Sequence, residues 1–194
     1  MNIGIYGGAF DPPHIGHANA ACQAVSFLSL DLLYVVPALS PPLKASPAAP
    51  PGQRLEMCRL AFRGENIVVD DFEIKKGGVS YTKDTLRHYG EIHPGARFFL
   101  IIGNDQLTQI EKWNSPEYIF KNAAIALVTR EKNADPESDI KRAQSMGANI
   151  IRVDIAVTEV SSTEIRNGQN TNRLDPVISE YIKTNGLYKK AEYR

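Results

Sequence analysis

The chain of 194 residues is long enough for one domain of above-average size and short for two. Its 22 acidic residues balance its 22 basic residues, so no overall positive charge would attract nucleic acid or an anionic membrane surface. No apolar run approaches the roughly 20 residues of a membrane span, and no basic leader precedes the first apolar run. We therefore expect a cytoplasmic protein without a membrane or nucleic-acid partner. Cys22 and Cys58 are too few for a disulfide framework, and we expect both to be buried small residues.

Short apolar runs alternate along the chain with segments of helical pattern. In chain order we predict a strand over 2–6, a helix over 16–28, a strand over 32–36, a proline-rich loop over 37–51, a helix over 53–63, a strand over 67–70, a turn at 76–78, a helix over 82–89, strands over 97–102 and 123–129, a helix over 138–146, a strand over 149–153, and helices over 162–167 and 175–184. The strands are continuous apolar runs, as in parallel sheets that are covered on both faces. The sequence thus predicts an α/β fold, a Rossmann-like doubly wound parallel sheet with helices on both faces. In such sheets ligands bind beyond the carboxyl ends of the strands.

The loop after the first strand combines glycines with two histidines. Gly7 and Gly8 permit a close backbone approach to a ligand, and the following helix start offers unpaired N–H groups to an anion. His14 and His17 are three residues apart, so both rings can lie on one face of the first helical turn. Neither the GxGxxG spacing nor a P-loop is present. A metal site with Asp11, and purely structural histidines, are the alternatives at this point.

The stretch GGAFDPPHIGH, residues 7–17, resembles the first signature of the nucleotidyltransferase superfamily, whose core is H-x-G-H. The same four residues occur in class I aminoacyl-tRNA synthetases, but those chains are far longer. A second signature of the superfamily is similar to VSSTEIR, residues 160–166, which by itself would be a helix start with a capping box between Ser161 and Glu164.

Further stretches resemble bacterial nicotinate-nucleotide adenylyltransferases over nearly the whole chain. They are SYTKDTL (80–86), LIIGNDQL (100–107), KW (112–113) and YIKTNGLY (181–188). The resemblance implies a nucleotidyltransferase-type fold and an adenylyltransferase that joins nicotinate mononucleotide to ATP, giving the dinucleotide and pyrophosphate in NAD biosynthesis. Two alternatives stay open. The acceptor could be nicotinamide mononucleotide, phosphopantetheine or another phosphate or alcohol, with Asp11 as the base for an alcohol. The chain could also be a non-enzymatic nucleotide-binding regulator.

The resemblance also implies site residues. His14, His17 and Arg166 would be catalytic, and ATP would be bound by these three with Gly8, Ala9, Phe10, Gly103, Asp105, Ser161, Ser162 and Thr163. Lys44, Thr82, Thr85 and Trp113 would bind the mononucleotide, with Lys44 reaching the phosphates from the proline-rich loop and Trp113 stacking on the pyridine ring. Mg²⁺ would be carried by the ATP phosphates and not by protein ligands. Plain alternatives are a core role for Trp113, a solvated Lys44, a helix-dipole role for Asp105, and Ser80 or Thr82 as a helix cap.

Two positions depart from the family pattern. Leu43 stands where a histidine often precedes the loop lysine, and Asn114 stands where an aromatic residue or histidine often follows the tryptophan. We expect one nucleotidyltransferase domain over residues 1–194, with a core to about residue 160 and a C-terminal helical part over about 161–194. A homo-oligomer stays open.

Overall fold

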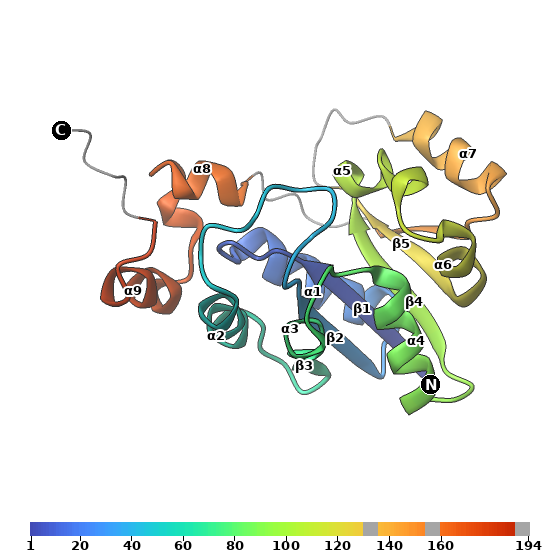
Figure 1. Cartoon of the computed structure of the whole chain (residues 1–194), viewed down its shortest axis with the longest axis horizontal. Helices are drawn as coiled ribbons and strands as arrows, with labels where there is room; N and C mark the ends of the chain where they lie inside the picture. Colours follow the sequence, from blue (N-terminus) through green and yellow to red (C-terminus); the bar gives the residue numbers. More distant parts are fainter. Residues whose placement is uncertain (130–135, 154–159, 189–194) are drawn as a thin grey trace.

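The computed structural model describes residues 1–129, 136–153 and 160–188, and the last six residues of the predicted C-terminal part lie outside this range. Within the described residues, six strands form one sheet in the order β3-β2-β1-β4-β5-β6, and every neighbouring pair is parallel. The strands are β1 (Asn2–Gly8), β2 (Leu32–Pro37), β3 (Ile67–Val69), β4 (Arg97–Gly103), β5 (Ala123–Val128) and β6 (Ile150–Val153). The predicted α/β class with a doubly wound parallel sheet is confirmed (Figure 1).

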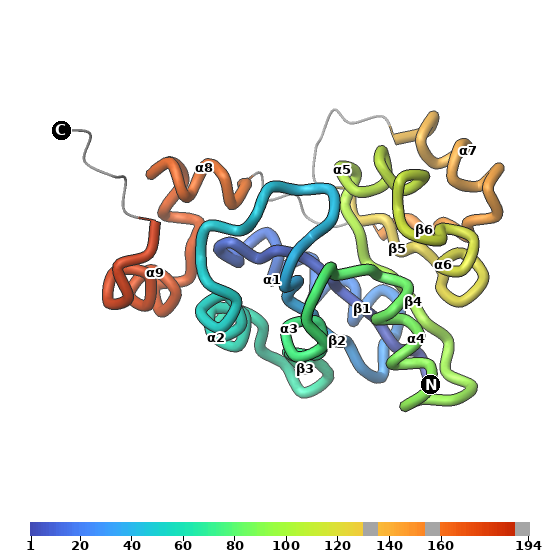
Figure 2. The backbone as a smooth tube through the Cα atoms, viewed as in Figure 1, coloured from blue at the N-terminus to red at the C-terminus, as the bar shows by residue number. Residues whose placement is uncertain are grey.

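Helices connect successive strands, and the last two helices follow strand β6. In the described residues they are α1 (Ile15–Phe27), α2 (Pro51–Ala61), α3 (Phe72–Lys76), α4 (Thr82–Ile92), α5 (Asn104–Leu107), α6 (Pro116–Asn122), α7 (Glu137–Ser145), α8 (Ser162–Arg166) and α9 (Pro176–Thr184), with 3-10 turns η1 (Ile110–Lys112) and η2 (Thr171–Arg173). The tube view shows α8 and α9 beside α2 and the loop that precedes it (Figure 2).

Both faces of the sheet are buried, which explains the continuous apolar runs. Ile3 and Ile5 of β1 belong to a core that includes residues of α4, α6 and α7. Tyr6, the next residue of the same strand, belongs to the opposite core with Ala20 and Ala24 of α1. Because successive strand residues point to opposite faces, a strand between two helical layers must be apolar at every position.

The order of the strands reverses at β1. Its neighbours are β2 on one side and β4 on the other, so the chain leaves β1 and β4 toward opposite faces of the sheet. The two strands end at Gly8 and Gly103, at the same edge. A crevice therefore opens beyond these ends, where ligands of doubly wound sheets bind.

Three short helices were not predicted. α3, α5 and α6 have five, four and seven residues, too few for a helical period to stand out. The expectation that both cysteines are buried is wrong for Cys22, which is exposed, and right for Cys58. The reason is the face of α1: its buried residues Gly16, Ala20, Ala21 and Ala24 follow the helical repeat, and position 22 does not.

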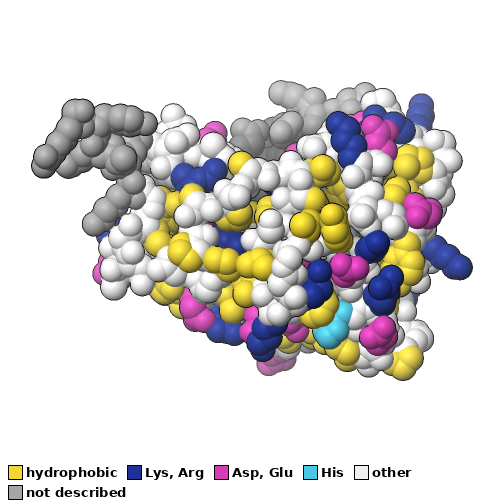
Figure 3. Space-filling view, in the orientation of Figure 1, with side chains coloured by type: hydrophobic (Ala, Val, Ile, Leu, Met, Phe, Trp, Pro, Cys, Tyr) yellow, Lys and Arg dark blue, Asp and Glu magenta, His cyan; other side chains and the backbone are white. Residues whose placement is uncertain are grey.

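In the part of the chain that the structure describes, no helix is long and apolar enough to cross a membrane. On the face shown in Figure 3, hydrophobic side chains gather across the middle, and basic and acidic side chains are interspersed around them.

Candidate active site

A large cleft of about 1200 Å³ lies at the carboxyl edge of the sheet. It collects every residue that the sequence analysis assigned to ATP, and Lys44 as well. These lining residues are Gly8, Ala9, Phe10, His14, His17, Lys44, Gly103, Asp105, Ser161, Ser162, Thr163 and Arg166. Residues more than 140 positions apart in the chain thus meet around one volume, which sequence spacing could not show.

The two histidines form a close, tilted ring pair at the start of α1. Their ring centroids are 3.7 Å apart with planes inclined by 34°, which confirms that both rings lie on one face of the first turn. The backbone N–H of His14 donates to Nδ1 of His17 at 3.3 Å. The acceptor role of Nδ1 places the proton of a neutral His17 ring on Nε2. The first turn of α1 carries no acidic residue, so the positive end of the helix dipole is not compensated there by its own side chains.

The backbone of the first loop runs close to an aromatic side chain. A Cβ atom at Gly8 would lie 3.0 Å from Cζ of Phe10, which is itself buried against Tyr6 and Phe62. The ring of Phe10 also packs edge-on against His17 at 5.2 Å. Glycine at position 8 lets the ring support the histidine without displacing the loop.

The second signature begins α8. Ser161 is the N-cap: its Oγ accepts from the N–H of Glu164 at 3.2 Å, and Oε2 of Glu164 accepts from the N–H of Ser161 at 2.8 Å. The predicted capping box is therefore confirmed. These hydrogen bonds lower the pKa of Glu164, because they stabilise its charged form.

α8 is tied directly to the loop of the first signature. Ser162 Oγ donates to the carbonyl oxygen of Pro12 at 2.8 Å, and Nη1 of Arg166 donates to the carbonyl oxygen of Asp11 at 2.6 Å. Nη2 of Arg166 donates to Oγ1 of Thr163 at 3.1 Å. A guanidinium has five N–H donors, so Arg166 can hold the loop and still face an anion in the cleft.

Lys44 and Asp105, which were given separate roles, form an ion pair at 3.1 Å across the cleft. Their side chains are 55% and 67% exposed, so the pair contributes at most about 1 kcal/mol. A ligand that offers a phosphate to Lys44 and a hydroxyl to Asp105 can therefore separate them at little cost.

An apolar pocket adjoins the cleft, and the residues that line both are Gly7, Gly8, Ala9, Lys44, Asp105 and Gln106. Thr82 and Trp113, both predicted for the mononucleotide, line this pocket, and so do Leu43 and Asn114, the two departures from the family pattern. The predicted Thr85 is not among its lining residues. Trp113 is half-buried and also packs against the core, so its core role is confirmed, and its stacking on a pyridine ring stays a prediction.

The start of α4 in this pocket has no side-chain cap. Ser80, a candidate cap, instead accepts from the N–H groups of Leu39 and Ser40 at 3.0 and 3.4 Å. The first N–H groups of α4, from Thr82 onward, therefore lack a side-chain acceptor, which suits an anionic group of a ligand.

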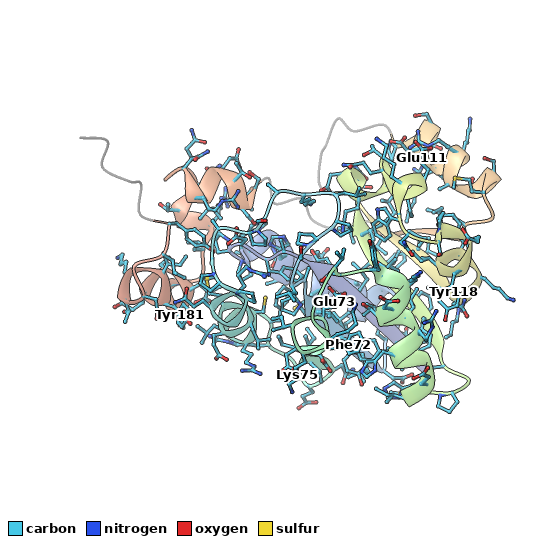
Figure 4. All side chains as sticks on the ribbon, viewed as in Figure 1. Phe72, Glu73, Lys75, Glu111, Tyr118 and Tyr181 are labelled. Atoms are coloured by element: carbon cyan, nitrogen blue, oxygen red, sulfur yellow. The ribbon has the colours of Figure 1, made fainter. Side chains whose placement is uncertain are left out.

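Glu73 of α3 is a pocket residue that sequence reasoning missed. Figure 4 labels its position beside Phe72. Glu73 is buried, lines the apolar pocket and accepts from Oγ1 of Thr85 at 2.6 Å. Burial raises the pKa of Glu73, and hydrogen bonds from Thr85 and Ser80 oppose that rise. A glutamate near two lysines in a short segment gives no sequence signal of burial.

Arg54 of α2 was missed for a similar reason. It is fully buried, and its guanidinium donates to the carbonyl oxygens of Ala9, Leu39 and Ala49 at 2.7, 3.4 and 3.1 Å. Burial lowers the pKa of Arg54. Arg54 thus connects the loop after β1, at Ala9, to the beginning and the end of the proline-rich loop, at Leu39 and Ala49. Arg173 of η2, also unassigned before, is an exposed residue at the lining of the cleft.

Residues 5–168 match the model of a family described as cytidylyltransferase-like. The chain is 34% identical over 200 residues to a probable nicotinate-nucleotide adenylyltransferase of Clostridium botulinum (strain Kyoto / Type A2), which covers 97% of this chain and 100% of that protein. It is 38% identical over 169 residues to a protein of the same name from Exiguobacterium sibiricum, with 86% of this chain and 85% of the relative covered.

A solved structure shares the fold. It is Plasmodium falciparum nicotinic acid mononucleotide adenylyltransferase complexed with NaAD, with a TM-score of 0.81, 22% identity and 97% of each chain covered.

Proposed function

The chain belongs to the cytidylyltransferase-like family, and we propose that it joins nicotinate mononucleotide to ATP, giving nicotinate adenine dinucleotide and pyrophosphate in NAD biosynthesis. Its relatives of nearly the same length carry the name of this activity, and the fold of the solved adenylyltransferase is the same. The observation that carries the proposal is the union of both signature motifs in one cleft that opens into the pocket at the start of α4.

The chemistry needs charge stabilisation more than a base. The nucleophile is a phosphate monoester whose second pKa is about 6, so it is largely a dianion at neutral pH. It must approach the α-phosphate of ATP in line, against the repulsion between two anions. Cations and N–H donors at fixed positions reduce that repulsion, and the cleft is lined by such groups.

On the ATP side we assign the roles as follows. His14, His17 and Arg166 contact the phosphates, where the two imidazole rings and the guanidinium stabilise the charge that develops on the α-phosphate and pyrophosphate. The backbone of Gly8, Ala9 and Phe10 and the start of α8 at Ser161, Ser162 and Thr163 surround the triphosphate, and Gly103 and Asp105 bind the ribose. The exposed Arg173 adds a cation to the same cleft.

On the mononucleotide side, Lys44 would leave Asp105 for the phosphate of the substrate, and Trp113 would stack on the pyridine ring. The uncapped start of α4 at Thr82 would bind the ring carboxylate through its N–H groups. Thr85 would not contact the mononucleotide itself. Its hydroxyl donates a hydrogen bond to Glu73, which lies beside this helix start.

The aspartates of the cleft are already engaged by protein groups, which favours a metal ion that is bound to ATP and not to the protein. The Asp11 carboxylate already accepts three hydrogen bonds, and Asp105 is paired with Lys44. Across the described ranges, no group of three or more His, Cys, Asp or Glu side chains could hold a metal ion. We therefore keep Mg²⁺ on the ATP phosphate oxygens, where it would neutralise charge on the departing pyrophosphate.

We also propose that residues 1–194 act as one domain, because Ser162 and Arg166 bind the first loop directly. Cytoplasmic location, the lack of a nucleic-acid partner and the homo-oligomer stay predictions.

The test is pyrophosphate release from ATP with three acceptors in parallel: nicotinate mononucleotide, nicotinamide mononucleotide and phosphopantetheine. A hydrogen bond to a charged group contributes roughly 1.5–3 kcal/mol, so we expect kcat/KM to favour nicotinate by at least about tenfold. Equal values for the two mononucleotides, or a preference for the amide, would refute the carboxylate pocket. Turnover of phosphopantetheine alone would identify the alternative transferase, and ATP binding without turnover of any acceptor would identify a regulator.

A further inference from the structure

The terminal stretch YIKTNGLY has no role in the chemistry described so far, yet its last residue reaches the first signature. The hydroxyl of Tyr188 donates to Oδ1 of Asp11 at 2.8 Å, across 177 positions of sequence. Burial and the neighbouring Asp11 carboxylate raise the pKa of Tyr188, so the phenol keeps its proton and remains a donor. The tyrosine therefore connects the C-terminal segment to the loop that carries His14 and His17.

Asp11 is almost fully buried, at 5% exposure, and both of its oxygens are engaged. Oδ1 accepts from Tyr188 and from the N–H of Ala49 at 3.0 Å, and Oδ2 accepts from the N–H of Ala48 at 2.7 Å. Nη1 of Arg166 lies 3.7 Å from Oδ2. A carboxylate has about four acceptor positions, and these four neighbours occupy them. Asp11 is thus a junction of four chain segments, and it is neither a metal ligand nor a base in this arrangement.

The ring of Tyr188 is held from the other side by packing. It lies against a small core of Ala49, Met57 and Ile178, which joins α2 to α9. Figure 4 places Tyr181 on α9 in the same C-terminal part. The packing of α9 on α2 consequently fixes the direction of the Tyr188 hydroxyl. The hydrogen bond to Asp11 therefore depends on how α9 is packed.

We propose that Tyr188 and Asp11 form a latch that holds the first-signature loop, the Ala48–Ala49 backbone and Arg166 in the geometry that binds the ATP phosphates. Both are positioning residues: they act through His14, His17 and Arg166 and do not contact the substrate. The latch rests on the proposed function for its effect on ATP, and its effect on the backbone at Ala48 and Ala49 can be measured without any substrate.

The first measurement is kinetic and uses Tyr188→Phe, which keeps the ring and removes the hydroxyl. We expect KM for ATP to rise roughly five- to tenfold while KM for nicotinate mononucleotide stays within about twofold, because only the ATP side of the cleft is loosened. Tyr181→Phe is the matched control: it lies on α9, which ends at Thr184, and its hydroxyl makes no hydrogen bond with any residue that the structure describes. Asp11→Asn should raise KM for ATP further, and adding Tyr188→Phe to it should have little extra effect.

The second measurement is amide hydrogen exchange in the absence of substrates. Residues 47, 50 and 51 are prolines, so Ala48 and Ala49 carry the only amide protons between them. In Tyr188→Phe these two protons should exchange faster than in the native protein and in Tyr181→Phe.

Unchanged exchange together with an unchanged KM for ATP in Tyr188→Phe would overturn the latch, whether or not Asp11→Asn folds. Equal rises of both KM values in Tyr188→Phe and Tyr181→Phe would also overturn it, in favour of general loosening. If the native protein releases no pyrophosphate with any acceptor, the proposed function fails, and the exchange measurement still decides on the latch.

Discussion

Replacement of His17 separates two contributions that one side chain makes. In the structure, Nδ1 of His17 accepts a hydrogen bond from the N–H of His14 and thereby caps α1, while the ring lies in the cleft against the ring of His14. His17→Ala removes both. His17→Gln removes the imidazole but supplies a side-chain oxygen at N3 of the helix, where glutamine completes a capping box.

The two losses differ in size. Loss of a helix cap costs about 1 kcal/mol of unfolding free energy, which for a chain of this length lowers Tm by roughly 2–4 °C. Loss of one donor that stabilises transition-state charge lowers turnover by about 10²- to 10³-fold. We therefore expect His17→Ala to lose at least about 10²-fold in kcat with a small decrease in Tm. His17→Gln should have nearly the native Tm and a similar loss of kcat.

The assay is pyrophosphate release at saturating substrates, with thermal unfolding of the same preparations. The reasoning is refuted if folded His17→Ala turns over within a few-fold of the native rate. It is also refuted if His17→Gln restores activity together with Tm, because the histidine would then serve only as a cap.

Three further variants test buried and cleft-lining charges. Arg54→Met leaves the three carbonyl oxygens bound by Arg54 without their donor, and at roughly 1–3 kcal/mol for each unsatisfied group it should lower the unfolding free energy in urea by at least about 3 kcal/mol. The exposed control Arg63→Met should stay within about 0.5 kcal/mol, and an equal loss in both variants would contradict the role of burial. Burial raises the pKa of Glu73 above its ordinary 4.5, so its contribution to stability is present below that pH and is lost as pH rises through the raised pKa. Glu73→Gln should therefore gain stability relative to the native protein as pH rises from about 4 to 8. If the difference in unfolding free energy between the two proteins, measured in urea, stays constant over this range, the raised pKa of Glu73 is excluded. Arg173→Gln should raise KM for ATP roughly three- to tenfold with little change in kcat, and an unchanged KM would remove Arg173 from the phosphate site.

Much of the fold could be predicted from the sequence because its signals are local. Continuous apolar runs predicted all six described strands, since a strand buried on both faces is apolar at each position. The loop with His14 and His17 and the capping box at Ser161 were also correctly placed, because glycine, histidine and serine act there within one turn of helix. The short helices α3, α5 and α6 were missed, because tertiary packing stabilises segments of that length more than their own sequence does.

What the sequence by itself determined about this protein is therefore the parallel sheet, its family resemblance and the residues of the two signature motifs. Only the tertiary structure decided which groups meet. It paired Lys44 with Asp105, placed Thr85 on Glu73, and engaged Asp11 from three other segments, including Tyr188 at the far end of the described chain. These contacts join positions up to 177 residues apart, and each depends on how helices pack on the sheet. A charged side chain on the surface is solvated, whereas a buried one must be hydrogen-bonded by the protein. For a single arginine, aspartate or glutamate, no periodicity in the sequence shows which of the two applies.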